Sequence, residues 1–160
     1  MFTLSRVDDR VIHGQIVTVW AHVCKCDAII VVDDEIAANP ALKTIYKNAI
    51  PGKNCYIFSL EQAYIKAKEA AESKKSYFLI AKNPLVYEKL HKAGVDFGNK
   101  LILGPMSGGK NGRQLIAQST SMNEDEADAC DYLLNNGIDV VFQTIPDKPA
   151  ISWHKVRNKE

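Results

Sequence analysis

The sequence is poor in cysteine, and its cysteines are not arranged as metal ligands. Its 160 residues contain only Cys24, Cys26, Cys55 and Cys130, of which only the first two are close together, as C-x-C. No second Cys or His pair completes a zinc-binding pattern. We therefore expect no metal site, and we expect reduced thiols packed in the core of a cytoplasmic protein.

Long apolar runs and an excess of charge of either sign are also absent. The longest apolar stretches, such as residues 28–32, are far shorter than the roughly 20 residues that span a bilayer. The first residues lack the apolar core of a signal peptide, so we do not expect export. Twenty basic residues balance nineteen acidic ones, and the formal charge of +1 gives no electrostatic case for binding nucleic acid or an anionic membrane.

What is present indicates one ordinary globular domain with a substantial core, since 46% of the residues are hydrophobic and 24% are charged. Short β-branched runs predict strands, and segments of helical period lie between them. The predicted strands are 2–7, 28–33, 54–59, 76–81, 100–104 and 139–145, and the predicted helices are 16–23, 41–49, 60–73, 84–93 and 121–137. This alternation predicts an α/β fold: a single doubly wound domain with a mostly parallel central sheet and helices on both faces.

Ligands of open α/β sheets bind outside the carboxyl ends of the strands. Two loops rich in functional groups follow predicted strands, namely 7–14 and 104–114. The first lies within RVDDRVIHGQIV (residues 6–17) and carries Arg6, Asp8, Asp9, Arg10 and His13. Because His13 comes just before a helix, it lies where free N–H groups and the helix dipole favour an anion. The dipole also disfavours the imidazolium, and a neutral imidazole is a nucleophile.

The neighbours of His13 fit a phosphoryl group. Gly14 lets a bulky group approach the backbone, Gln15 offers a donor, and Arg10 can pair with phosphate oxygens through its planar fork. Asp8 or Asp9 either holds Arg10 or accepts a hydrogen bond from one imidazole nitrogen, leaving the other free to attack.

This set of residues suits phosphoryl transfer through a phosphohistidine, without a metal. The competing interpretation is that the two aspartates shape a turn, Arg10 is solvated, and His13 is a neutral cap or core residue.

The stretch RVDDRVIHGQIVTVW resembles the active-loop signature, close to R-I-D-D-R-L-I-H-G-Q-V, of the IIB component of the mannose/fructose/sorbose family of the bacterial PEP-dependent sugar phosphotransferase system (PTS). The likeness also covers the chain length, the alternation of strands and helices, a Gly- and Met-containing loop near residue 104 and the IPDKP stretch at 145–149. It therefore implies one PTS IIB domain spanning residues 1–160.

The resemblance implies a protein-Nπ-phosphohistidine–sugar phosphotransferase that needs no cofactor. His13 would accept phosphate on Nδ1 from the Nε2-phosphohistidine of a IIA component. It would then pass the phosphate to a sugar bound by the membrane components IIC and IID. Arg10 would neutralise the moving phosphoryl group, and Asp8 would support the loop. Arg6 also matches the family signature, but whether it contacts the phosphate or a partner is left open. The identity of the sugar and the presence of a homo-oligomer are left open as well. The protein would be cytoplasmic and peripherally associated with the membrane transporter.

The second loop contains GPMSGGK at 104–110, which satisfies G-x-x-x-x-G-K. Asn111 stands where a nucleotide-binding P-loop needs Ser or Thr, so we do not assign a nucleotide site. Many members of the family have G-G-M where this chain has Gly104, Pro105 and Met106, and we expect the loop to shape the site and a docking face. Lys110 and Arg113 either bring positive charge to a phosphorylated partner or are solvated surface residues.

Asp33 and Asp34 are expected to be a strand end and helix cap rather than the acidic pair of a receiver domain, because the third predicted strand, CYIFS at 55–59, ends without a phospho-acceptor aspartate. The alternative function is a non-catalytic regulatory module that uses the same anion site to bind a phosphorylated metabolite or partner.

Overall fold

The computed structural model describes residues 1–158, apart from the side chains of Gln15 and Ile16. Its main sheet has the strand order β3-β2-β4-β1-β5-β8-β9. Six strands are parallel, and β9 pairs antiparallel with β8. The bounds are β1 (Phe2–Val7), β2 (Ala28–Val32), β3 (Asn54–Phe58), β4 (Tyr77–Ala81), β5 (Lys100–Leu103), β8 (Asp139–Phe142) and β9 (Ile151–Ser152).

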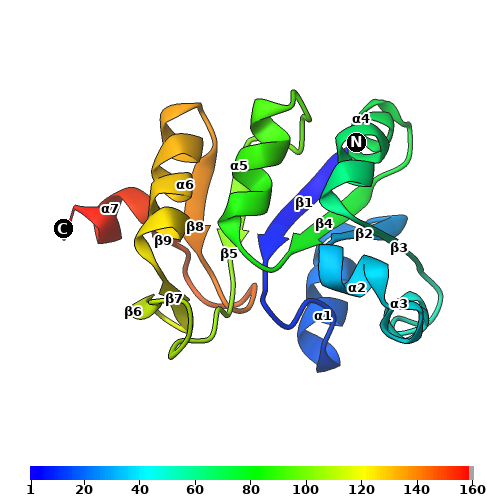
Figure 1. Cartoon of the computed structure of the whole chain (residues 1–160), viewed down its shortest axis with the longest axis horizontal. Helices are drawn as coiled ribbons and strands as arrows, with labels where there is room; N and C mark the ends of the chain where they lie inside the picture. The colour runs from blue at the N-terminus through cyan, green and yellow to red at the C-terminus, as the bar shows by residue number, and fades with distance from the viewer. Residues whose placement is uncertain (159–160) are drawn as a thin grey trace.

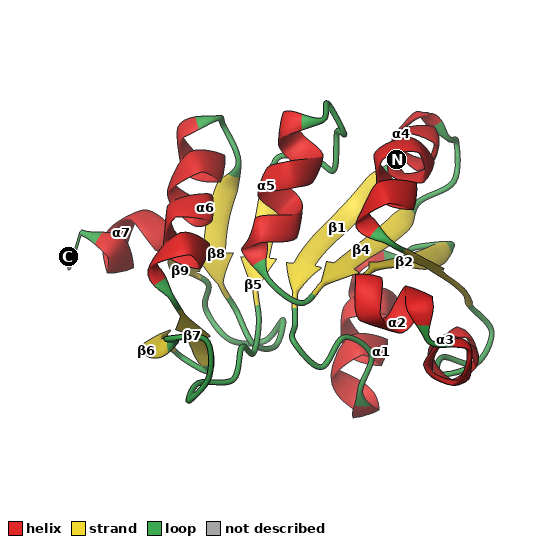
Figure 2. Cartoon of the chain, viewed as in Figure 1, coloured by secondary structure: helices red, strands yellow, loops and turns green. Residues whose placement is uncertain are grey.

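Helices cover both faces of this sheet, as predicted for a doubly wound fold (Figures 1 and 2). On one face, α4 (Leu60–Glu72), α5 (Pro84–Lys92), α6 (Glu124–Asn135) and α7 (Trp153–Arg157) pack over a core that includes Leu79, Leu101 and Phe142. On the other face, α1 (Gly14–Cys24), α2 (Asp34–Ala38) and α3 (Pro40–Lys47) pack over a second core that includes Ile29 and Ile80.

Helix starts follow local side-chain chemistry. Asp33 caps α2 by accepting a hydrogen bond from the backbone of Ile36, as expected for a strand end and helix cap. The carboxylate of its neighbour, Asp34, accepts from the backbone N–H of Leu60, the first residue of α4. Among the described residues, no helix is both long and apolar enough to cross a membrane.

One predicted helix begins later than the sequence pattern indicated. Residues 121–122 belong to a two-stranded antiparallel hairpin of β6 (Gln114–Ala117) and β7 (Thr120–Met122), which the sequence did not predict. Asn123 then forms a capping box with Glu126 and starts α6. The segment predicted as a helix at 41–49 is α3, which follows directly on α2, and β9 and α7 were also not predicted.

The sheet changes its winding direction between β1 and β5. These strands are neighbours, but β1 leads through α1 on one face to β2, whereas β5 leads through the hairpin and α6 on the other face to β8. The loops that leave β1 and β5 therefore diverge at the carboxyl edge, which is the usual ligand position in such folds.

Candidate functional site

The loop after β1 is a tight turn organised by Asp8. The backbone N–H of Asp8 donates to the carbonyl of Ala81 in β4, and Oδ1 of Asp8 accepts from the N–H of Arg10 at 3.0 Å. The N–H of Val11 closes the turn on the carbonyl of Asp8 at 3.0 Å. Val11 is buried and has φ of +59°, a conformation that a β-branched side chain disfavours. The surrounding structure therefore holds this turn against a local cost of about 1–3 kcal/mol.

The same carboxylate orients the ring of His13. His13 is the N-cap residue of α1, and its Nε2 lies 2.8 Å from Oδ2 of Asp8. Asp8 is only 3% exposed, whereas the His13 side chain is 18% exposed. A carboxylate can only accept, so Nε2 donates and carries the proton. Nδ1 is then the nitrogen with the free electron pair, and it has no hydrogen-bond partner among the described residues.

The surroundings of His13 are open on the side of the helix start. Gly14 is exposed and has φ of +49°, and apart from its chain neighbours and its own helix backbone no atom lies within 4 Å of where its Cβ would be. The first turn of α1 contains no acidic residue, so its N–H groups and dipole favour an anion there. Gln15, the other predicted phosphate ligand, has a side chain that lies outside the described part of the structure.

Arg10 is exposed, and its guanidinium makes no hydrogen bond or ion pair with the described residues. Of the two roles considered for the aspartates, holding Arg10 is therefore wrong, and Asp8 binds the imidazole instead. The Asp8 carboxylate already accepts from the Arg10 backbone and from His13, which leaves the Arg10 side chain in solvent beside the loop.

Asp9 joins the two loops. Its N–H donates to the carbonyl of Pro105 at 3.0 Å, and its Oδ2 accepts from the N–H of Ser107 at 2.6 Å. The side chain is 8% exposed, and its Oδ1 is buried without a hydrogen-bond partner in the described structure. The loop after β5 thus lies against the His13 loop, as expected of a segment that shapes the site.

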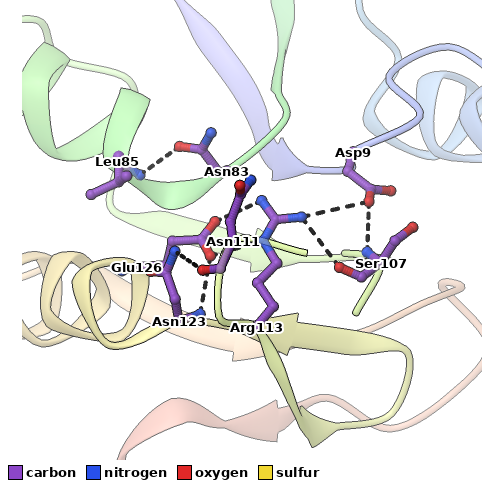
Figure 3. Close-up of polar contacts among 8 residues, drawn as sticks. All are labelled: Asp9, Asn83, Leu85, Ser107, Asn111, Arg113, Asn123 and Glu126. Carbon is purple, nitrogen blue, oxygen red and sulfur yellow. Dashed lines mark hydrogen bonds and ion pairs between the residues drawn. The ribbon is translucent and has the colours of Figure 1, made fainter. Parts of the chain in front are cut away.

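Arg113 corrects a second expectation. Its Nε and Nη2 donate to the two carboxylate oxygens of Glu126 at 2.9 and 2.7 Å, and Nη1 donates to the carbonyl of Ser107 at 3.3 Å (Figure 3). The same Nη1 is 3.9 Å from Oδ2 of Asp9. With side-chain exposures of 7% for Arg113 and 2% for Glu126, this arginine is neither solvated nor available to a partner. It ties both loops to the start of α6, whereas Lys110 is exposed.

Arg6 is buried beneath the site and braces it. Its guanidinium donates to the carbonyls of Gln143 and Thr144 at 2.7 and 2.9 Å and lies 4.7 Å from the ring centre of Trp20. Burial lowers the pKa of Arg6 to about 10. These bonds hold the side chain against the loop after β8, and Arg6 is buried rather than presented at the surface.

Gly104 makes room for that brace. A Cβ at this position would lie 2.5 Å from Nη2 of Arg6 and 2.7 Å from the carbonyl oxygen of Val7. Sequence reasoning had singled out Gly104 only as the start of a Gly-rich loop. The signal for the brace was a charged residue, Arg6, inside the predicted strand 2–7.

The three remaining histidines stand apart from this site, and His22 lies in the last turn of α1, at the opposite end of that helix. His91 bonds to the hydroxyl of Tyr132 at 2.9 Å, and His154 lies beside Asn158 near the end of the chain. Within the described part of the chain, no group of three or more His, Cys, Asp or Glu side chains is placed to hold a metal ion.

Fold and site together define an α/β domain with a carboxylate-oriented histidine at an anion-favouring helix start, on the switch point of a parallel sheet. Comparison with known proteins gives the family. The model described as "PTS system sorbose subfamily IIB component" matches residues 2–160. The chain belongs to this family and is a IIB component of a sugar phosphotransferase system.

Individual relatives agree with this assignment. The sorbose-specific EIIB component of Lacticaseibacillus casei is 30% identical over 151 residues, which cover 94% of this chain and 91% of that protein. The mannose-specific EIIAB component of Escherichia coli K12 is 30% identical over 160 residues, and the match covers 98% of this chain but 48% of that longer protein. The crystal structure of the IIBSor domain of the sorbose permease from Klebsiella pneumoniae superposes with a TM-score of 0.92, at 25% identity, covering 99% of this chain and 97% of that one.

Membership in this family makes the protein part of a phosphotransferase. IIB components work with a IIA component and with membrane components, and the Escherichia coli relative is by name an EIIAB protein.

Proposed function

We propose that His13 is the phosphoryl-carrying residue of this IIB component and that Nδ1 is the atom that carries the group. The supporting observation is the 2.8 Å contact between Nε2 of His13 and Oδ2 of the buried Asp8. A carboxylate on Nε2 keeps the proton there and leaves the electron pair on Nδ1.

In the first step, Nδ1 attacks the phosphorus of a phosphohistidine on a IIA component. The bond from phosphorus to the donor nitrogen breaks, and its electron pair returns to the donor ring. The acceptor imidazole becomes cationic while it carries the phosphoryl group, and the negative charge of Asp8 on Nε2 offsets this charge.

In the second step, a sugar hydroxyl attacks the same phosphorus. The P–Nδ1 bond breaks and its electron pair returns to the imidazole, the hydroxyl proton passes to water, and His13 returns to the neutral tautomer that Asp8 favours. The sugar is held by membrane components IIC and IID, and the carrier therefore docks at the membrane from the cytoplasmic side. Which sugar is phosphorylated depends on those components.

Arg10, Gly14 and Gln15 bind the phosphoryl group in this proposal. The Arg10 guanidinium is exposed and uncommitted among the described residues, and it lies three positions before His13. Its fork can pair with two phosphoryl oxygens. Gly14 is exposed at the helix start and lets a bulky group approach the backbone, and the N–H groups at the start of α1 add partial positive charge.

The experiment is transfer from a phosphorylated IIA component of the mannose type, followed by ³¹P NMR, with His13→Gln as the matched variant. We expect a new phosphoramidate resonance on the wild-type protein and none on His13→Gln, with both proteins folded by circular dichroism. Full phosphorylation of the variant would refute the assignment to His13. Binding of the donor without transfer would favour a regulatory module.

A further inference from the structure

The C-x-C pair lies at the opposite end of α1 from His13. Cys24 is the last residue of that helix, and Cys26 lies two residues before β2. Lys25, between them, is the C-cap residue and has left-handed backbone angles, with φ of 51°. This turn reverses the chain direction at the helix end and brings the two flanking thiols to the same place.

Both sulfur atoms approach one carbonyl group. Sγ of Cys24 is 3.5 Å and Sγ of Cys26 is 3.8 Å from the carbonyl oxygen of Ala21. Nζ of Lys53 donates to the carbonyl of Cys26 at 2.6 Å and fixes the segment from the other side. The side chain of Cys26 lowers the pKa of Cys24 to about 7 through a hydrogen bond, and the same pairing raises the pKa of Cys26.

The four cysteines differ in their access to solvent. Cys24 is partly exposed, whereas Cys26, Cys55 and Cys130 are 2%, 5% and 0% exposed. Burial raises the pKa of Cys55 to about 12 and also raises that of Cys130. The expectation of inert core thiols therefore fits Cys55 and Cys130, but it does not describe a reachable thiol with a second thiol beside it.

We propose that Cys24 and Cys26 form a thiol–disulfide exchange site for small disulfides, with Cys24 as the attacking and Cys26 as the resolving thiol. The Cys24 thiolate attacks one sulfur of the small disulfide, forming a mixed disulfide and releasing one thiolate. The Cys26 thiol then loses its proton and attacks Sγ of Cys24, which releases the second small thiol and leaves a Cys24–Cys26 disulfide. The small disulfide is reduced by two electrons, and the protein dithiol is oxidised by the same two.

The experiment treats the folded protein with oxidised glutathione and follows its intact mass over time. We expect the wild-type mass to fall by two hydrogen atoms without lasting gain of a glutathionyl group, and peptide mapping to place the disulfide between Cys24 and Cys26. A stable glutathionyl adduct on the wild type, an unchanged mass, or a disulfide to Cys55 or Cys130 would each overturn the proposal.

Two variants separate the roles of the thiols. Cys26→Ser should keep one glutathionyl group on Cys24, because the resolving thiol is gone, whereas Cys24→Ser should not react on the same time scale. Cys55→Ser and Cys130→Ser are the matched controls and should close the disulfide as the wild type does. The experiment on the wild-type protein is informative even if a variant fails to fold. None of these outcomes depends on phosphoryl transfer at His13.

Discussion

Removal of the Arg113 side chain is the perturbation that most directly tests how the two loops are held together. In Arg113→Met, Glu126 would keep a buried carboxylate and lose a bidentate partner at 2.9 and 2.7 Å. Breaking a buried ion pair by removing one partner costs about 3–5 kcal/mol. Glu126 still accepts from the N–H of Asn123 at 3.1 Å, which places the expected loss at the lower end, about 3 kcal/mol. For a chain of this size, this corresponds to a fall in Tm of roughly 6–12 °C.

Urea unfolding followed by tryptophan fluorescence and circular dichroism gives the free energy of unfolding. The matched control is Arg157→Met, because Arg157 also contacts three carboxylates but is 33% exposed. Exposed pairs are worth about 1 kcal/mol or less. The double variant Arg113→Met/Glu126→Met should regain part of the loss, since an apolar pair needs no counter-charge, but Asp9 would still lack its cation. Equal losses in Arg113→Met and Arg157→Met would refute the reasoning.

Three further changes test other parts of the site. In Asp8→Asn, the amide nitrogen must face either the Arg10 N–H or His13 Nε2, and neither is an acceptor in the present structure. The turn or the imidazole therefore loses its hydrogen bond, and phosphoryl transfer should slow on the order of 10²-fold. An unchanged transfer rate by ³¹P NMR would contradict the role of Asp8. Gly104→Ala places a methyl group 2.5 Å from the Arg6 guanidinium and should lower the free energy of unfolding by about 1–3 kcal/mol, which thermal and urea unfolding measure. Arg10→Lys keeps the charge but not the planar fork, so kcat for transfer should fall more than KM for the phosphorylated IIA component rises; equal kinetic constants would remove Arg10 from the proposed mechanism.

The central sheet and the position of the His13 loop were predictable because they depend on local patterns. Residues 28–32 form a β-branched run that is buried in full, and it is β2. His13 precedes a segment of helical period and is the N-cap of α1. Because the strands are parallel, the order of strands and helices alone places the His13 loop at the carboxyl edge of the sheet.

The contacts that hold the site were not predictable in this way. Glu126 meets Arg113 across a hairpin whose two strands are short and partly polar, so neither strand has the pattern of a sheet. The sequence left open whether Arg6 reaches a phosphate or a partner, and its partners are carbonyls 137 and 138 residues away in the chain. Such pairings depend on tertiary packing. A charged residue such as Arg6 inside a predicted strand signals that a partner is needed, but one sequence does not say which groups supply it.

The left-handed Val11 limits how far the signature RVDDRVIHGQ can be moved between proteins. Its backbone conformation is disfavoured for valine, and the bonds from the Asp8 and Asp9 backbones to Ala81 and Pro105 belong to other strands and loops. A peptide with these ten residues, or the same residues grafted onto an unrelated strand and helix, lacks those anchors and relaxes to an ordinary turn. Transplanting a phosphoryl carrier onto a new scaffold therefore requires the neighbouring strand ends as well as the motif, and the smallest unit to transplant is a piece of sheet.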